Sequence, residues 1–309
     1  MRTMLNTSIA TFRPLTGVYE PSAIHQLRDG RFLVVEDEEA HPFSLVTLGH
    51  DEVSAVPLRP GLFEFDDEFW KLDDLEALAL HSSGYIYATT SHSRDGEGRE
   101  KKSREKLVRF RVDGDDVADK QVMHGLKAAL IAAHPVLATA AAVLDVKNQG
   151  GLNIEAMEFA PDTGHLWLGF RSPVPNGQAI LAAVENPSAM FDAGEPPRIA
   201  SELINLKLDG HGLRDMAWVA SLGGYLLIAG PVAREQAPFR LWFWNGQADT
   251  RPRCVDVPGL PGFAHAEGVC PAIIEGREVI VIVSDDGDRA AGRCAGFLLA
   301  EPDQLSIEP

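Results

Sequence analysis

A hairpin that recurs five times constrains the fold of this chain more than any other feature. Each copy has a short apolar strand, a turn and a strongly β-forming second strand. Turn residues such as Ser82-Ser83-Gly84 and Leu222-Gly223-Gly224 separate the two strands of a copy. The copies lie at 21–35, 75–90, 154–170, 214–229 and 266–283.

A third strand follows each hairpin, and several of these run into a fourth across turns such as Trp244-Asn245-Gly246. We expect the third strands at 43–48, 106–112, 179–184, 239–244 and 294–300. Four antiparallel strands form one β-propeller blade, and a blade spans about 40–50 residues. The sequence therefore predicts an all-β, five-bladed propeller in which 1–20 supplies the closing strand of the last blade. A sixth, divergent blade and a β-sandwich are the alternatives, although a sandwich needs no hairpin repeated in register.

One segment, 125–144, is rich in Ala and Leu and is the only convincing helical sequence. Pro135 interrupts it, because proline cannot continue a helix. We expect two short helices here, inserted between the second and third blades and capping one face. With this insertion the chain reads as one domain over 1–309.

Charge and cysteine content narrow the class of partner. The formal net charge is −17, which disfavours binding to nucleic acid or to anionic membrane surfaces. No apolar run approaches the ~18 residues that span a bilayer, and 1–15 has no signal-peptide core. Cys254, Cys270 and Cys294 lack any zinc-binding spacing, so we expect reduced, mostly buried thiols and a cytoplasmic protein.

Acidic residues open the first strand in four of the five copies. In a propeller these starts meet the ends of the second strands at one mouth of the channel, and the second strand of the first copy ends in the acidic run 36–39. Carboxylates gathered there need protons, basic partners or a cation. Oxygen ligands suit a hard divalent ion such as Ca²⁺, Mg²⁺ or Mn²⁺. The predicted ligands are Glu76, Glu155, Asp215 and Glu267, with Asn153 and His265 completing the shell.

The alternative is that these acids are structural and accept backbone N–H groups from the next blade. Basic residues are predicted at the same mouth, where Arg171 would bind an anion and His92 would act as a general base. Arg214 could instead pair with a carboxylate of the mouth, and His92 could be an exposed loop residue. The basic segment 94–106 reads as a mobile, solvated loop, or as a lid over the mouth.

The stretch Gly151-Leu152-Asn153-Ile154-Glu155-Ala156-Met157, with 168–173, resembles the signature of an uncharacterised bacterial β-propeller family, a domain of unknown function. That family is in turn similar to the esterase-like phytases. Thr90-Ser91-His92-Ser93 and Ala266-Glu267-Gly268 match it too, and the resemblance covers 18–299. It implies a propeller and phosphoester hydrolysis, with matching positions at Ser91, His92, Asn153, Glu155, Arg171 and Glu267. The chain has Ala156 where the family usually has glycine, and it lacks the secretion signal common among phytase-like proteins.

These observations together predict a metal-dependent hydrolase that acts on a small anionic ester, such as a phosphoester, at one mouth of the channel. The competing hypothesis is a non-catalytic propeller that binds a small ligand or a protein partner, because fold alone does not fix function.

Overall fold

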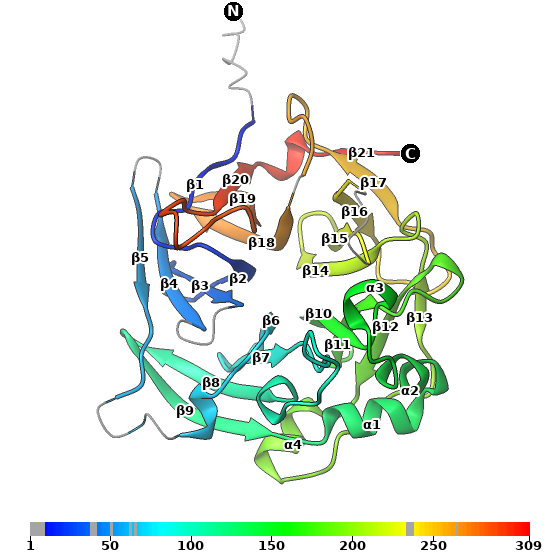
Figure 1. The fold of residues 1–309 in the computed structure, drawn as a ribbon. Coiled ribbons are helices and arrows are strands. Elements are labelled where there is room, and N and C mark those ends of the chain that lie inside the picture. The colour runs from blue at the N-terminus through cyan, green and yellow to red at the C-terminus, as the bar shows by residue number, and fades with distance from the viewer. Residues whose placement is uncertain are drawn as a thin grey trace, which may run out of the picture.

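The computed structural model shows five antiparallel sheets arranged in a ring around a central axis (Figure 1). It describes residues 10–37, 42–49, 52–61, 64, 67–232, 238–263 and 265–309. Glu38 and Glu39, which the sequence placed at the mouth, lie outside this part of the chain. The predicted five-bladed β-propeller is confirmed, and the described residues contain neither a sixth blade nor a pair of stacked sheets.

The blades follow one another along the chain, and each begins with its innermost strand. Blade one contains β2 (Pro21–Gln26), β3 (Phe32–Glu36), β4 (Phe43–Leu48) and β5 (Val53–Pro57). Blade two contains β6 (Leu75–Leu80), β7 (Ile86–Thr90), β8 (Leu107–Asp113) and β9 (Asp116–Met123). Blade three contains β10 (Asn153–Phe159), β11 (Leu166–Ser172), β12 (Ala179–Val184) and β13 (Ile204–Leu206).

Each of the last two blades has an outermost strand that does not come directly before or after its neighbouring strand in the chain. Blade four contains β14 (Gly212–Val219), β15 (Gly224–Gly230), β16 (Arg240–Trp244), β17 (Arg253–Asp256) and the late strand β21 (Ser306–Ile307). Blade five contains β18 (Ala266–Ile274), β19 (Arg277–Ser284), β20 (Gly296–Ala300) and, as its outermost strand, β1 (Arg13–Pro14). Arg13 pairs with Phe297, so an N-terminal strand closes the last blade, as predicted.

Side-chain hydrogen bonds add to the closure between blades five and one. The Gln26 side chain accepts a hydrogen bond from the Ile273 amide at 2.7 Å and donates one to the Ile273 carbonyl at 2.9 Å. The backbone N–H of Gln26 donates to Cys270 Sγ at 3.2 Å. One glutamine therefore pairs with the edge of the neighbouring inner strand as another strand would.

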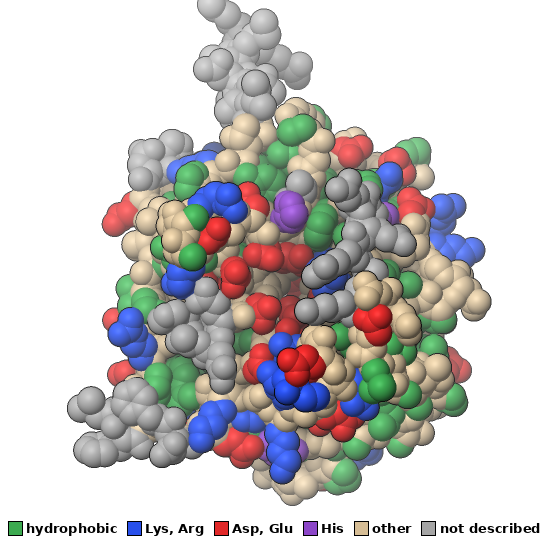
Figure 2. All heavy atoms as spheres, viewed as in Figure 1, with side chains coloured by type: hydrophobic (Ala, Val, Ile, Leu, Met, Phe, Trp, Pro, Cys, Tyr) green, Lys and Arg blue, Asp and Glu red, His purple; other side chains and the backbone are tan. Residues whose placement is uncertain are grey.

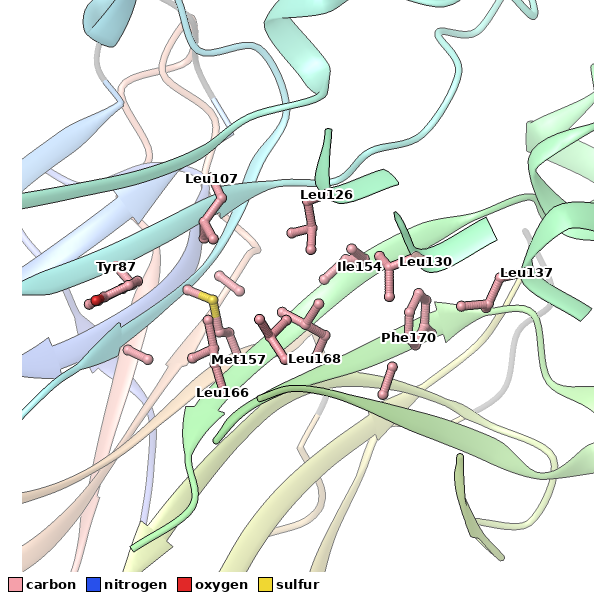
Figure 3. Close-up of a cluster of buried hydrophobic side chains, with 14 of the residues drawn as sticks. Tyr87, Leu107, Leu126, Leu130, Leu137, Ile154, Met157, Leu166, Leu168 and Phe170 are labelled. Carbon is pink, nitrogen blue, oxygen red and sulfur yellow. The ribbon is translucent and has the colours of Figure 1, made fainter. Parts of the chain in front are cut away.

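The helical insertion is also confirmed. It forms α1 (Leu126–Ala133) and α2 (Pro135–Ala141), with Pro135 at the first position of α2, and adds a short α3 (Val146–Gln149). Figure 3 shows why it stays on blades two and three: Leu126, Leu130 and Leu137 project into a shared core. All three are fully buried and belong to the same core cluster as side chains of β10 and β11, such as Ile154, Met157, Leu168 and Phe170.

The remaining short helices lie between strands. They are α4 (Pro187–Asp192), η1 (Glu68–Trp70), η2 (Lys102–Arg104), η3 (Pro175–Gly177) and η4 (Pro302–Gln304). None of the helices in the described part of the chain is long and apolar enough to cross a membrane. The three cysteines are unpaired, and Cys254 and Cys270 are buried, as expected.

Two buried acids connect neighbouring blades by accepting backbone N–H groups. Glu158 accepts from Phe159 at 2.7 Å and from Trp218 of the next blade at 3.1 Å. Asp215 likewise accepts from Met216 and from Val269 of the next blade, both at 2.8 Å. Burial raises the pKa of both carboxyl groups, and that of Glu158 reaches about 7.

The raised pKa of Glu158 predicts a stability that falls as pH rises. Above its ordinary value of 4.5 the carboxyl ionises in the unfolded chain first, so stability is lost between about pH 4.5 and 7. The loss is of the order of 3 kcal/mol. Urea unfolding at pH 5 and pH 8 should show a clearly smaller pH dependence for Glu158→Gln than for the unchanged protein. Asp162→Asn, at an exposed turn acid, is the control and should keep the full dependence.

Candidate metal and anion site

The inner strands of all five blades contain a register shift at the same place. In each, one residue of the inner strand has no partner on the second strand. Such β-bulges commonly re-aim a side chain next to an active site. The five unpaired residues, which we call the bulge ring, are Ser22, Glu76, Glu155, Arg214 and Glu267. Figure 2 shows acidic side chains gathered at this mouth of the channel.

The fourth position of the bulge ring is Arg214, not Asp215 as the sequence pattern suggested. A shift of one residue along a strand points the side chain to the opposite side. Asp215 is therefore buried between blades four and five, with its two oxygens bonded to Met216 and Val269 N–H groups. Asp215, which the sequence predicted as a metal ligand, thus accepts backbone N–H groups as the structural alternative expected.

Arg214 neutralises two members of the bulge ring. Its Nη1 lies 3.1 Å from Glu155 Oε2 and 2.9 Å from Glu267 Oε1, while its Nη2 donates to the Pro231 carbonyl at 3.0 Å. The guanidinium carbon stacks 5.2 Å from the Phe239 ring centre. The alternative expectation for Arg214, a salt bridge within the ring, is confirmed. Burial nonetheless raises the pKa of Glu267 to about 8, with Arg214 opposing the rise.

Arg171 adds a second positive charge on Glu155. Its Nη1 donates to Glu155 Oε1 at 3.0 Å, and its Nε donates to the Pro231 carbonyl at 3.3 Å. Asn153 Nδ2 donates to the same Glu155 oxygen at 2.7 Å. Glu155 therefore has an arginine ion pair on each of its oxygens, although its buried Oε2 has no hydrogen bond among the described residues.

Glu76, on the other side of the channel, has different neighbours. One oxygen each from Asp37, Asp74 and Glu76 lie within 4.8 Å of one another, and we call these three the acidic trio. Asp74 Oδ2 accepts from Ser93 at 3.0 Å and from Arg104 at 2.9 Å, and also from Ser91. The side chains of Asp37 and Glu76 have no hydrogen bond or ion pair with any residue that the structure describes.

The charges of the acidic trio repel one another. Burial, followed by the charges of Glu155, Asp74 and Asp37, raises the pKa of Glu76 well above its ordinary value. The Asp37 side chain is exposed at the rim, yet desolvation by the surrounding protein and the nearby Asp74 raise its pKa to about 8. A bound cation would remove this repulsion and favour the ionised forms.

The acidic trio forms one wall of a cavity of about 450 Å³. Arg94, Arg104 and Arg171 line the same cavity, as does Asn153, whose buried Oδ1 has no partner among the described residues. His265 is exposed, with its ring 5.8 Å from that of Phe239, and it does not line the cavity. The mouth thus presents carboxylates and guanidinium groups to one space.

His92, which the sequence predicted as a general base, is not among the described residues that line this cavity. It is fully buried, and its Nε2 lies 3.1 Å from the Thr89 hydroxyl. The backbone of His92 is in the left-handed region, with a φ of 56°, and not in an extended conformation. Burial, followed by the charge of Lys127, lowers the pKa of His92 to about 3, so the ring is neutral.

The basic segment 94–106, which we expected to be a mobile loop, is instead packed against the protein. Arg104 pairs with Asp73 at 3.1 Å and with Asp74 at 2.9 Å. Lys106 is buried, and its ammonium donates to the backbone carbonyls of Glu68 and Lys71. These bonds hold the segment against blade two, where it supports the acidic trio.

Sequence reasoning missed Asp74 and Arg104. The pair Asp73-Asp74 directly precedes the first strand of the second copy, two residues before its acidic marker Glu76, which was the available signal. The place of Asp74 in the site depends on its contacts with residues 91–104, and the sequence does not show those contacts. Asp37 was included only as part of an acidic run, with nothing to separate it from Glu36. In the structure Glu36 is buried and paired with Ser44 and Arg289.

Loss of Arg214 should destabilise the fold strongly. Arg214→Met removes the cation that pairs with both Glu155 and Glu267 and leaves the buried Glu155 carboxylate with Arg171 alone, for an expected cost of about 3–5 kcal/mol near pH 7. Arg277→Met is the control, because its pair with Glu301 is exposed and should be worth less than about 1 kcal/mol. Equal, small losses for both variants in urea unfolding would contradict this account.

Solved structures of other propeller-like proteins are similar to this chain. A glucose dehydrogenase matches with a TM-score of 0.50 and 12% identity, over 94% of this chain and 98% of that one. A GH43 β-1,3-galactosidase, solved with galactodeoxynojirimycin, matches with a TM-score of 0.50 and 9% identity, over 96% and 98%. A putative glucose dehydrogenase from Thermus thermophilus has a TM-score of 0.47 and 14% identity, over 94% and 100%. At these identities the likeness concerns the fold.

No curated protein is similar enough in sequence to count as a relative. One family model does match, over residues 133–295, and its description is a protein of unknown function, DUF3616. The comparisons thus support the resemblance to an uncharacterised propeller family, and the similarity to phytases is not among what they show. Because the match spans more than half of its length, this chain belongs to the DUF3616 family.

Proposed function

We propose that this protein is a metal-dependent hydrolase of a small anionic ester, acting in the cavity at the mouth of the channel. One observation carries the proposal: the acidic trio faces the same 450 Å³ cavity as Arg171, Arg94 and Arg104. A site that binds both a cation and an anion suits an ester whose charge the metal and an arginine share. Phosphoesters are the first substrates to test, in line with the resemblance described above.

Asp37, Asp74 and Glu76 would hold the ion. All offer carboxylate oxygens, which suit Ca²⁺, Mg²⁺ or Mn²⁺ rather than softer metals. Of the ligands expected from the sequence, Glu76 is retained. Asp37 and Asp74 take the place of Glu155 and Glu267, whose charges Arg171 and Arg214 already balance. When bound, such an ion polarises the ester and lowers the pKa of a coordinated water.

Arg171 would bind the anionic group of the substrate. Its side chain is 29% exposed, and its Nη2 has no hydrogen bond with any described residue. The bonds from Nε and Nη1 to Pro231 and Glu155 fix the plane of the guanidinium before a ligand arrives. A pre-oriented fork loses less side-chain entropy on binding an anion than a free arginine does.

One observation favours non-catalytic ligand binding as a second candidate. No histidine or cysteine is found among the described residues that line the cavity, so proton transfer would depend on carboxylates. Ser93 lines the cavity, but its hydroxyl is bonded to Asp74 without a histidine to activate it. Turnover of a hydrolysable phosphoester in the presence of a divalent ion separates the two functions.

Metal binding should depend on the acidic trio. Saturation with Ca²⁺ or Mn²⁺ at ~100 times its dissociation constant should stabilise the protein by about 2.7 kcal/mol. Asp37→Asn and Glu76→Gln should each lower the affinity at least tenfold, measured by calorimetry on protein treated with a chelator. Glu267→Gln is the control on the same mouth and should keep the affinity. If only Glu267→Gln lost metal binding, the metal site would instead lie at Glu267, on the opposite side of the bulge ring.

Anion binding should depend on Arg171 without affecting the metal. Arg171→Lys keeps the positive charge but loses the planar fork, so the dissociation constant for inorganic phosphate should rise about tenfold. Metal content, measured by elemental analysis, should stay unchanged. Unchanged phosphate affinity would make Arg171 a salt-bridge partner of Glu155 and no more.

A further inference from the structure

A second cavity adjoins the polar one. Its volume is about 420 Å³, and its walls are mostly apolar. Gly151, Ser172 and Val232 line both cavities, so the two spaces share a wall at these residues. The remaining lining comes from two sides: Val136, Thr139, Ala140, Val143, Gln149 and Gly150 of the helical insertion, and Pro173, Val174 and Pro175 after β11.

The helical insertion presents an apolar stripe to this second cavity. Val136 and Ala140 lie about one turn apart on α2, and Val143 follows two residues after the helix ends at Ala141. Leu137, on a neighbouring face of the same helix, is fully buried in the core cluster and holds α2 in place (Figure 3). The position of the stripe is thus fixed by packing, which suits a binding wall better than a mobile cover does.

The polar atoms of the second cavity are mostly occupied by the protein itself. The Thr139 hydroxyl donates to the Pro135 carbonyl at 3.0 Å, one turn back in the helix. Ser172 Oγ accepts from the Gly151 N–H at 3.3 Å. A ligand in this space would therefore meet methyl and methylene groups for the most part.

We infer that the ligand of this mouth is amphiphilic, with an anionic head in the polar cavity and an alkyl or aryl group in the apolar one. The inference rests on the proposed binding of an anion by Arg171, and it specifies the class of ester. Continuity through Gly151, Ser172 and Val232 is the observation that assigns both cavities to one molecule. Apolar ligand groups gain affinity in such a pocket by leaving water.

Calorimetry with inorganic phosphate, methyl phosphate, butyl phosphate and hexyl phosphate tests the inference. Affinity should rise with chain length, by up to about fourfold for each buried methylene. Val143→Asp places a charge in the apolar cavity and should abolish this rise while leaving the affinity for inorganic phosphate unchanged. Leu144→Asp, at the adjacent position, where the side chain is 64% exposed and does not line the cavity, is the matched control and should keep the rise. Thermal unfolding of both variants checks that the fold is retained.

The outcomes separate this inference from the proposed hydrolase. Affinity that rises with chain length and is lost in Val143→Asp supports an amphiphilic ligand, even if no ester is turned over with any ion. Equal affinity for all four phosphates overturns it, even if metal binding and turnover are found. A rise that survives in Val143→Asp also overturns it, because the alkyl chain would then lie elsewhere. Failure of every phosphate to bind would reject the anionic head and the inference with it.

Discussion

The site depends on how the protein keeps several carboxylates together in a poorly solvated mouth. Five bulges at equivalent positions direct five side chains to the same place, and three of them are glutamates. Arg214 takes the fourth place and reaches a glutamate on either side, at 3.1 Å and 2.9 Å. Because Arg214 belongs to the bulge ring itself, its charge neutralises glutamates of both neighbouring blades, and no further segment is needed to supply a cation. The remaining glutamate, Glu76, has no ion pair with any residue that the structure describes, which is why we propose it as a metal ligand.

The repeat predicted the fold because it records main-chain geometry. Turn residues and β-forming strands recur wherever a blade recurs, and two of the five predicted third strands, β4 and β12, coincide with those observed. Pro135 marked the break between two helices for the same kind of reason, since proline cannot continue a helix. Ala156 fits at its position because its neighbour across the ladder is Gly169, where a Cβ would lie 2.8 Å from that of Ala156.

The site was harder to predict than the fold, because side-chain direction depends on single-residue details. The fourth copy offered Arg214 and Asp215 side by side, and only the observed bulge shows which of them faces the channel. His92 appeared to stand at the mouth, but its positive φ turns it into the core, where it bonds Thr89. Asp74 became part of the site because the segment after β7 folds back over it and supplies Ser91, Ser93 and Arg104. None of these contacts leaves a periodic trace in the sequence.

The pairing of β1 with β20 joins residues from opposite ends of the chain, and it determines the order in which the molecule can be completed. Blades one to three contain only strands that are consecutive in the chain, so each can form as soon as its last strand exists. Blade five cannot, because its outermost strand β1 is made before every other strand, whereas β18, β19 and β20 are made after all strands of blades one to three. During synthesis the edge of β2 therefore stays without its neighbour β18, and the mouth of the channel has no closed wall. The ring of charges can assemble only after the final blade has met the first.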